Sequence, residues 1–108
     1  MLLENNNIPF TMQKTYPDLI SPKNKLLRYD FFIDNSFLLE IDGTFHYYAS
    51  GGWATEEKVK RTQEYDQIKN NYCKINHIPL KRIPYNQINN LTIEDIMSEK
   101  FLINIEEE

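Results

Sequence analysis

The sequence contains a single cysteine, Cys73, among its 108 residues. One cysteine excludes an internal disulfide and a zinc site built on several thiolates, and it suits a reducing compartment. No apolar stretch approaches the roughly 20 residues that a membrane-spanning helix needs. The N-terminal residues show no basic segment followed by an apolar run, so no signal peptide is expected. We therefore predict a cytoplasmic protein without a membrane partner.

Internal repeats and low-complexity linkers are also lacking, apart from the closing run of glutamates at 106–108. With 41% hydrophobic residues, a chain of this length supports one hydrophobic core and is too short for two. We expect a single domain over residues 1–108 that ends in an acidic tail at about 102–108.

A positive net charge, the usual property of a nucleic-acid-binding protein, is missing, because the formal net charge is −4. Residues 54–82, however, contain 7 basic and 4 acidic side chains, whereas residues 1–53 contain 4 and 6 and residues 83–108 contain 1 and 6. Phosphate contacts come from local Lys and Arg side chains. The central segment therefore leaves a weak or tethered nucleic-acid site open, and a solvated helix surface is the alternative for Lys58, Lys60 and Arg61.

Runs of aromatic and branched residues predict a set of short strands, and helical spacing predicts two helices. Three strands followed by a helix and a fourth strand imply an α/β (α+β) fold with a mixed four-stranded sheet, order βββαβα, under helix cover. A loop is expected over 16–25, where prolines gather, and another over 43–54, which holds Gly51 and Gly52. The expected strands span 8–16, 26–33, 37–42 and 78–83, and the expected helices span 55–75 and 92–101.

The long helix is expected to begin after Thr55 as its cap, with glutamates in its first turn. Asp66 and Lys69 lie one turn apart on one stripe of this helix. A local ion pair worth a few tenths of a kcal/mol is the structural alternative to a functional role for them. A second stripe is expected to be buried because its side chains are apolar and helically spaced: Tyr65, Ile68, Tyr72 and Ile75.

Three acids lie in the predicted hairpin of strands 26–33 and 37–42. If residues 34–36 form the turn, partner numbers sum to 70, and Asp30 faces Glu40 directly. Side chains alternate along a strand, so Asp42 points to the same side as Glu40. Two like charges about 5 Å apart repel by roughly 3 kcal/mol at an effective dielectric of about 20. A divalent cation would offset this repulsion, and it would take carboxylate oxygens as ligands.

The alternative is that these acids lie on a solvated face. The opposite face of the hairpin is apolar enough to supply a core by itself, and it consists of Tyr29, Phe31, Ile33, Phe37, Leu39 and Ile41.

The run around the acids resembles a family of nucleases. It reads Leu-Arg-Tyr-Asp30-Phe-Phe-Ile, then Leu-Leu-Glu40-Ile-Asp42-Gly-Thr-Phe-His46, then Glu-Tyr-Asp66-Gln-Ile-Lys69 and, further on, Leu-Lys-Arg82-Ile-Pro. This pattern is similar to the small PD-(D/E)XK, or restriction-endonuclease-like, nucleases, in the branch related to very-short-patch-repair endonucleases and to phage or mobile-element nucleases. The resemblance covers roughly residues 5–86. It implies a metal-dependent endonuclease that hydrolyses DNA phosphodiester bonds, and so a DNA partner.

The resemblance also implies roles for individual residues. Asp30 and Glu40 would bind Mg²⁺ or Mn²⁺, with Asp42 as a further ligand or a supporting acid. His46 would act as a base or orient the attacking water, with a structural histidine as the alternative. Lys69 would replace the usual strand lysine, since Asp42 occupies its position. The DNA backbone would be contacted by basic residues of the central segment: Lys58, Lys60, Arg61 and Arg82.

Two departures from the family pattern lead to rival expectations. Residues 2–8 resemble only the last turn of the family's first helix, which would leave one sheet face open and favour a homodimer or a partner chain. The usual strand lysine is absent, which favours a catalytically inactive DNA- or protein-binding regulatory module. One half of a split nuclease is the third expectation.

Overall fold

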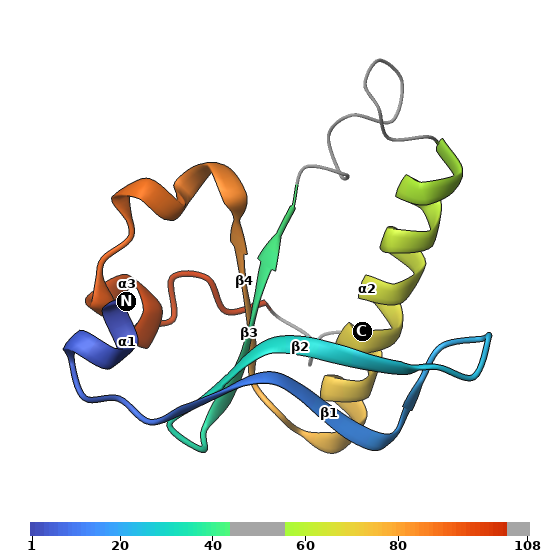
Figure 1. Cartoon of the computed structure of the whole chain (residues 1–108), viewed down its shortest axis with the longest axis horizontal. Helices are drawn as coiled ribbons and strands as arrows, with labels where there is room; N and C mark the ends of the chain where they lie inside the picture. The colour runs from blue at the N-terminus through green and yellow to red at the C-terminus, as the bar shows by residue number, and fades with distance from the viewer. Residues whose placement is uncertain (44–55, 104–108) are drawn as a thin grey trace.

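The computed structural model of the chain describes residues 1–43 and 56–103. It is an α+β structure with one open, mixed sheet of four strands, in the spatial order β1-β2-β3-β4 (Figure 1). The strands β1 and β2 pair antiparallel, as do β2 and β3, whereas β3 and β4 pair parallel. The predicted mixed four-stranded sheet with helices is therefore confirmed. None of the helices in the described part of the chain is long and apolar enough to span a membrane.

The elements follow one another in nearly the predicted order. A short helix precedes the first strand, and a 3₁₀ helix precedes the last helix; neither was predicted as a separate element, although residues 2–8 were compared with the end of a helix. The bounds are α1 Leu2–Asn5, β1 Phe10–Ile20, β2 Leu26–Ile33, β3 Phe37–Asp42, α2 Glu56–Asn76, β4 Leu80–Pro84, η2 Tyr85–Asn90 and α3 Ile93–Met97.

Two of the predicted strands were wrong at their ends. Strand β1 continues through Pro17 to Ile20, where a loop was expected, and it tolerates the proline because it is an edge strand of the sheet. Its pairing with β2 shifts register between Thr15 and Ile20. Strand β4 begins at Leu80, two residues later than predicted.

The last helix is also shorter than predicted, because it ends at Met97. It begins at the predicted cap, where the Thr92 hydroxyl accepts from the Asp95 amide and the Asp95 carboxylate accepts from the Thr92 amide. The ammonium of Lys81 donates to the Ile96 carbonyl at 2.7 Å. This hydrogen bond connects β4 to α3. Residues 102 and 103 were assigned to the tail, but Leu102 is the bridge partner of Lys81 and the Ile103 amide donates to the Leu80 carbonyl at 3.0 Å.

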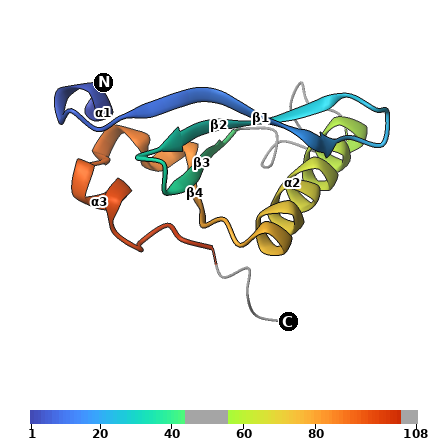
Figure 2. The same ribbon diagram turned by 90° about the horizontal axis from the view of Figure 1, so that it is seen from below.

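Strands β3 and β4 lie between two groups of helices (Figures 1 and 2). Helix α2 lies on one side, where a first cluster of buried side chains gathers around Tyr29, Leu38 and Cys73. Helices α1 and α3 lie on the other side, over a second cluster around Ile33 and Leu39. Helices α1 and α3 therefore cover part of the sheet on this side, and the predicted homodimer or partner chain stays a prediction.

The side-chain alternation of β2 breaks at Asp30. Tyr29 was expected on the face opposite the acids, but it packs toward α2, whereas Phe31 packs on the other side. Gln13 lies across from Asp30 in β1 and adopts a left-handed φ of 55°, which is uncommon outside glycine. At this irregularity the side chains of β2 change from the α2 side, where Tyr29 packs, to the opposite side, where Phe31 packs.

The buried stripe of α2 differs from the predicted one. Cys73 is fully buried, whereas Ile75 is 66% exposed. Two residues apart on a helix means about 160° apart around its axis, so both cannot face the sheet. The sheet-facing side is the stripe that carries Asp66 and Lys69, and the apolar side chains Tyr65, Ile68 and Tyr72 flank it half-buried.

Candidate active site

The two predicted ligand carboxylates meet where β2 and β3 diverge. The register pairs Phe31 with Leu39, and its continuation places Asp30 across from Glu40 as predicted. The Asp30 amide donates to Glu40 Oε2 at 2.7 Å, and the Ile41 amide donates to Asp30 Oδ2 at 2.7 Å. Each carboxylate thus accepts a hydrogen bond from the neighbouring strand, and the pair is interlocked across β2 and β3.

Lys69 completes this cluster from helix α2. Its ammonium lies 2.7 Å from Glu40 Oε1, so the lysine pairs with a strand acid 29 residues earlier in the chain. Glu40 is only 5% exposed. Burial raises the pKa of the Glu40 carboxyl, and the charge and hydrogen bond of Lys69 oppose that rise. Amide donors and an ammonium therefore offset much of the repulsion between Asp30 and Glu40.

Tyr29 connects the same cluster to the helix. Its hydroxyl donates to the Lys69 carbonyl at 2.8 Å and accepts from the Cys73 thiol at 3.4 Å. The Lys69 ammonium lies 5.6 Å from the centroid of the Tyr29 ring, within cation–π distance. Burial raises the pKa of the Tyr29 hydroxyl, so it stays a donor. Sequence alternation predicts Tyr29 on the other face, and it lies here because the alternation of β2 breaks at Asp30.

Arg82 on β4 organises a second group of acids beside the first. Its guanidinium lies 2.8 Å from Asp42 Oδ1 and 3.5 Å from Asp66 Oδ1, and its Nε donates to Asn70 Oδ1 at 3.0 Å. The Arg82 side chain is 10% exposed. Arg82 also pairs with Glu40 in the parallel ladder between β3 and β4, which joins the two groups. Its predicted contact with the DNA backbone stays a prediction, and its observed partners are acids.

The joined cluster has a net negative charge. Four carboxylates, on Asp30, Glu40, Asp42 and Asp66, face the two cations Lys69 and Arg82. Counting only these six side chains of the described residues, all ionised, four negative charges less two positive charges leave two negative charges.

The donor set suits a cation that takes few protein ligands. Among residues 1–43 and 56–103, no group of three or more His, Cys, Asp or Glu side chains is arranged to hold a metal ion. Mg²⁺, however, commonly uses one or two carboxylates and completes its shell with water and substrate phosphate. Asp30 Oδ1 accepts no hydrogen bond from the described residues, so one oxygen of the pair is free to bind. Asp30 and Glu40 therefore fit a two-carboxylate site, while Asp42 is already paired with Arg82.

The remaining predicted residues lie elsewhere. Lys58, Lys60 and Arg61 occupy the first turns of α2 and are exposed. His46 falls outside the described residues, as do Thr55 and the Gly51–Gly52 pair. Asn70 was not predicted as a site residue, although its position four residues after Asp66 would have placed it one turn further along the same helix.

No protein-family model, no curated protein and no solved structure matches the chain.

Proposed function

We propose that the chain is a metal-dependent DNA endonuclease with a restriction-endonuclease-like fold. The observation that carries this proposal is the cluster of Asp30, Glu40 and Lys69: two interlocked carboxylates on adjacent strands with an ammonium 2.7 Å from one of them. The spacing of these residues also resembles the PD-(D/E)XK pattern. A carboxylate pair with a neighbouring lysine is a suitable set of groups for phosphodiester hydrolysis.

Each side chain has a defined task in this proposal. Asp30 and Glu40 hold Mg²⁺ or Mn²⁺, which when bound polarises a phosphate and lowers the pKa of water. Lys69 neutralises charge that develops on the phosphate oxygens. Arg82 holds Asp42 and Asp66 beside the site and keeps their charges from repelling the substrate.

Plasmid nicking in the presence of Mg²⁺ or Mn²⁺ tests the proposal. Asp30→Asn and Glu40→Gln keep the shape of the side chains and remove the charge, so we expect each to lower nicking by at least about 100-fold. Lys69→Met removes one electrostatic donor, which typically costs about 10²–10³-fold in rate. Lys25→Met, in the exposed loop between β1 and β2, is the matched control and should nick like wild type. Equal nicking by all proteins, or none by any, contradicts the proposal.

A regulatory module without catalysis is the second candidate, because both Glu40 oxygens already accept hydrogen bonds from protein groups. In that case Lys69 replaces the cation permanently, and the chain binds no metal. Calorimetry with Mn²⁺ separates the two candidates. Micromolar affinity that is lost in Glu40→Gln supports the nuclease, and the absence of binding by wild type supports the module. The split-nuclease alternative stays a prediction.

A further inference from the structure

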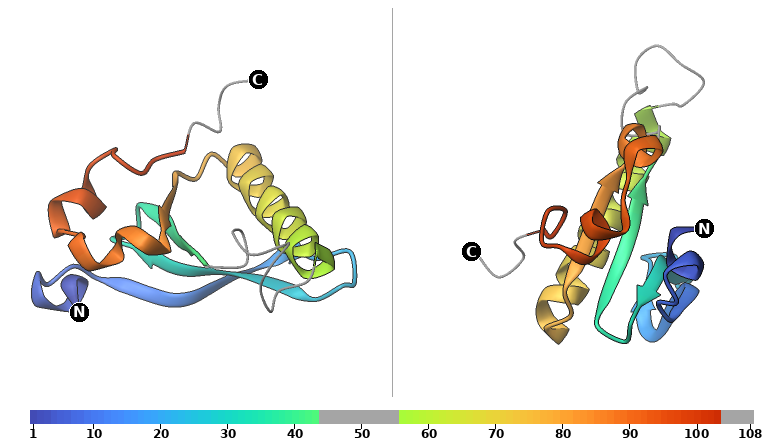
Figure 3. Two further views of the ribbon diagram at one scale, coloured as in Figure 1. Left: turned by 90° about the horizontal axis from the view of Figure 1, so that it is seen from above. Right: turned by 90° about the vertical axis from the view of Figure 1, so that its left-hand side faces the viewer.

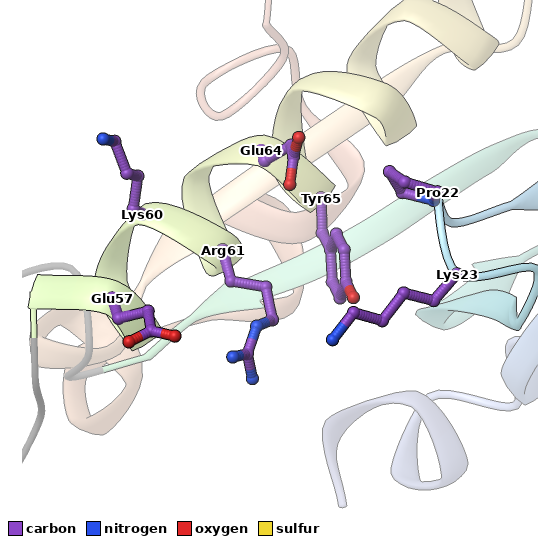
Figure 4. A pocket seen from close by; sticks show the side chains of 7 residues that line it. All are labelled: Pro22, Lys23, Glu57, Lys60, Arg61, Glu64 and Tyr65. Carbon is purple, nitrogen blue, oxygen red and sulfur yellow. The ribbon is translucent and has the colours of Figure 1, made fainter.

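A second feature lies away from the acids, between the loop that joins β1 to β2 and the first turns of α2. The loop lies beside the start of the helix (Figures 2 and 3). The two enclose a cleft of about 410 Å³, with Pro22 and Lys23 on the loop side and Arg61 and Tyr65 on the helix side (Figure 4). The cleft thus combines side chains from residues about 40 positions apart.

The loop wall of the cleft is held in place by Ser21. This serine is 5% exposed, and its hydroxyl accepts from the backbone amides of Lys23 and Lys25 at 3.3 and 3.2 Å. Asn24 adopts a left-handed φ of 65°, a conformation that asparagine tolerates better than most residues. The backbone that carries Lys23 is therefore ordered before any ligand arrives.

Two cations converge in this cleft. The Arg61 guanidinium and the Lys23 ammonium extend toward the same opening, with the Tyr65 ring beside the Lys23 ammonium, whereas Lys60 extends the other way (Figure 4). Neither Lys23 nor Arg61 forms an ion pair with any residue that the structure describes, although Glu57 and Glu64 also line the cleft. Like charges that share an opening repel. An anion between them would turn this repulsion into attraction on both sides.

We propose that the cleft binds the sugar–phosphate backbone of a DNA strand that is held at the Asp30–Glu40 site. The inference rests on the proposed function and adds Lys23 as a contact residue. Tyr65 precedes Lys69 by four residues, or about 6 Å along the helix, so a strand in the cleft continues toward the acids. Arg61 offers a planar fork of donors to phosphate oxygens. The Tyr65 ring offers a surface on which a base or sugar packs.

DNA binding measured by fluorescence anisotropy in EDTA tests the cleft apart from catalysis. We expect Lys23→Ala and Arg61→Ala each to weaken binding of a labelled duplex about tenfold near 50 mM salt, because each loses one phosphate contact. Each should also lower the slope of log affinity against log salt by about 1. Lys25→Ala is the matched control, because Ser21 contacts only the backbone of that residue. It should bind like wild type.

The outcomes separate this inference from the proposed function. If nicking requires Glu40 but Lys23→Ala and Arg61→Ala bind DNA like wild type, the cleft is not a backbone site. If Lys25→Ala loses as much affinity as Lys23→Ala, general surface charge accounts for binding and the inference fails. Complete displacement of the duplex by an equal concentration of dAMP would indicate a pocket for a free phosphate monoester, which also overturns it. Loss of binding in both cleft variants, without nicking by wild type, supports the cleft and contradicts the nuclease.

Discussion

At the scale of single residues, Glu40 shows how one buried charge is accommodated. Its carboxylate is 5% exposed and accepts from one amide and one ammonium. Desolvation still outweighs these contacts, since the pKa of the Glu40 carboxyl is raised. The native state therefore binds the Glu40 proton more tightly than the unfolded chain does.

This difference makes stability depend on pH in a defined direction. As pH rises from the ordinary glutamate pKa of about 4.3 through the raised native value, the native state must give up a proton that it holds more tightly than the unfolded chain. The free energy of unfolding of wild type minus that of Glu40→Gln should therefore decrease over this range. Urea unfolding at a series of pH values measures it, with Glu64→Gln as a control for the loss of an exposed charge. A constant or rising difference would contradict the direction assigned to Glu40.

At the scale of elements, the irregularity of β2 at Asp30 determines how α2 docks. Tyr29 turns toward the helix, and its hydroxyl bridges the Lys69 carbonyl and the Cys73 thiol. Because Lys69 and Cys73 are one turn apart, a single side chain from the sheet fixes this part of the helix. The same docking brings the Lys69 ammonium to Glu40.

Removal of this hydroxyl should loosen the helix. Tyr29→Phe leaves the ring in place, removes the partner of the buried Cys73 thiol and removes a donor to the half-buried Lys69 carbonyl, so we expect the free energy of unfolding to fall by about 1–2 kcal/mol. Chemical denaturation measures the change. As a control, Tyr65→Phe removes a hydroxyl from α2 itself and should change the free energy of unfolding by less than about 0.5 kcal/mol. A similar loss in both variants would show that the Tyr29 hydrogen bonds add nothing specific.

At the scale of the whole molecule, the site lies between the strands and α2, on one side of a sheet that has a core cluster on each side. Helix α2 and the cluster around Cys73 lie on one side of β3 and β4, and the short helices α1 and α3 lie on the other (Figure 3). The short helices belong to the core as well, because Leu3 and Ile96 are 3% and 4% exposed. A ligand bound between the strands and α2 would therefore stabilise the entire chain.

Metal binding should consequently appear as a thermal shift. A ligand at 100 times its dissociation constant stabilises the native state by about 2.7 kcal/mol, which corresponds to roughly 10 °C in Tm for a chain of this size. We expect this shift with Mn²⁺ for wild type and for Glu64→Gln, and none for Asp30→Asn or Glu40→Gln. Differential scanning fluorimetry at increasing Mn²⁺ provides the measurement. An unchanged Tm for wild type, or an equal shift in all four proteins, argues against binding at these carboxylates.

The sequence alone determined the local part of this structure. The hairpin of β2 and β3 has the predicted bounds and register, because a short turn and a period of two decide which residues face each other. The positions of Asp30 and Glu40 follow from that register. The start of α3 at Thr92 was predictable for the same reason, since a capping box is a contact over three residues.

Only the tertiary structure decided which distant side chains meet. Tyr29 packs on the side opposite to the one predicted because the alternation of β2 breaks at Asp30, and a strict period of two does not predict such a break. Arg82 pairs with Asp42 across 40 residues, Lys69 with Glu40 across 29, and Lys23 shares a cleft with Arg61. The first contact depends on the parallel pairing of β3 with β4, and the other two depend on how α2 packs against the strands. Both are set by the packing of the whole core rather than by any short segment of sequence.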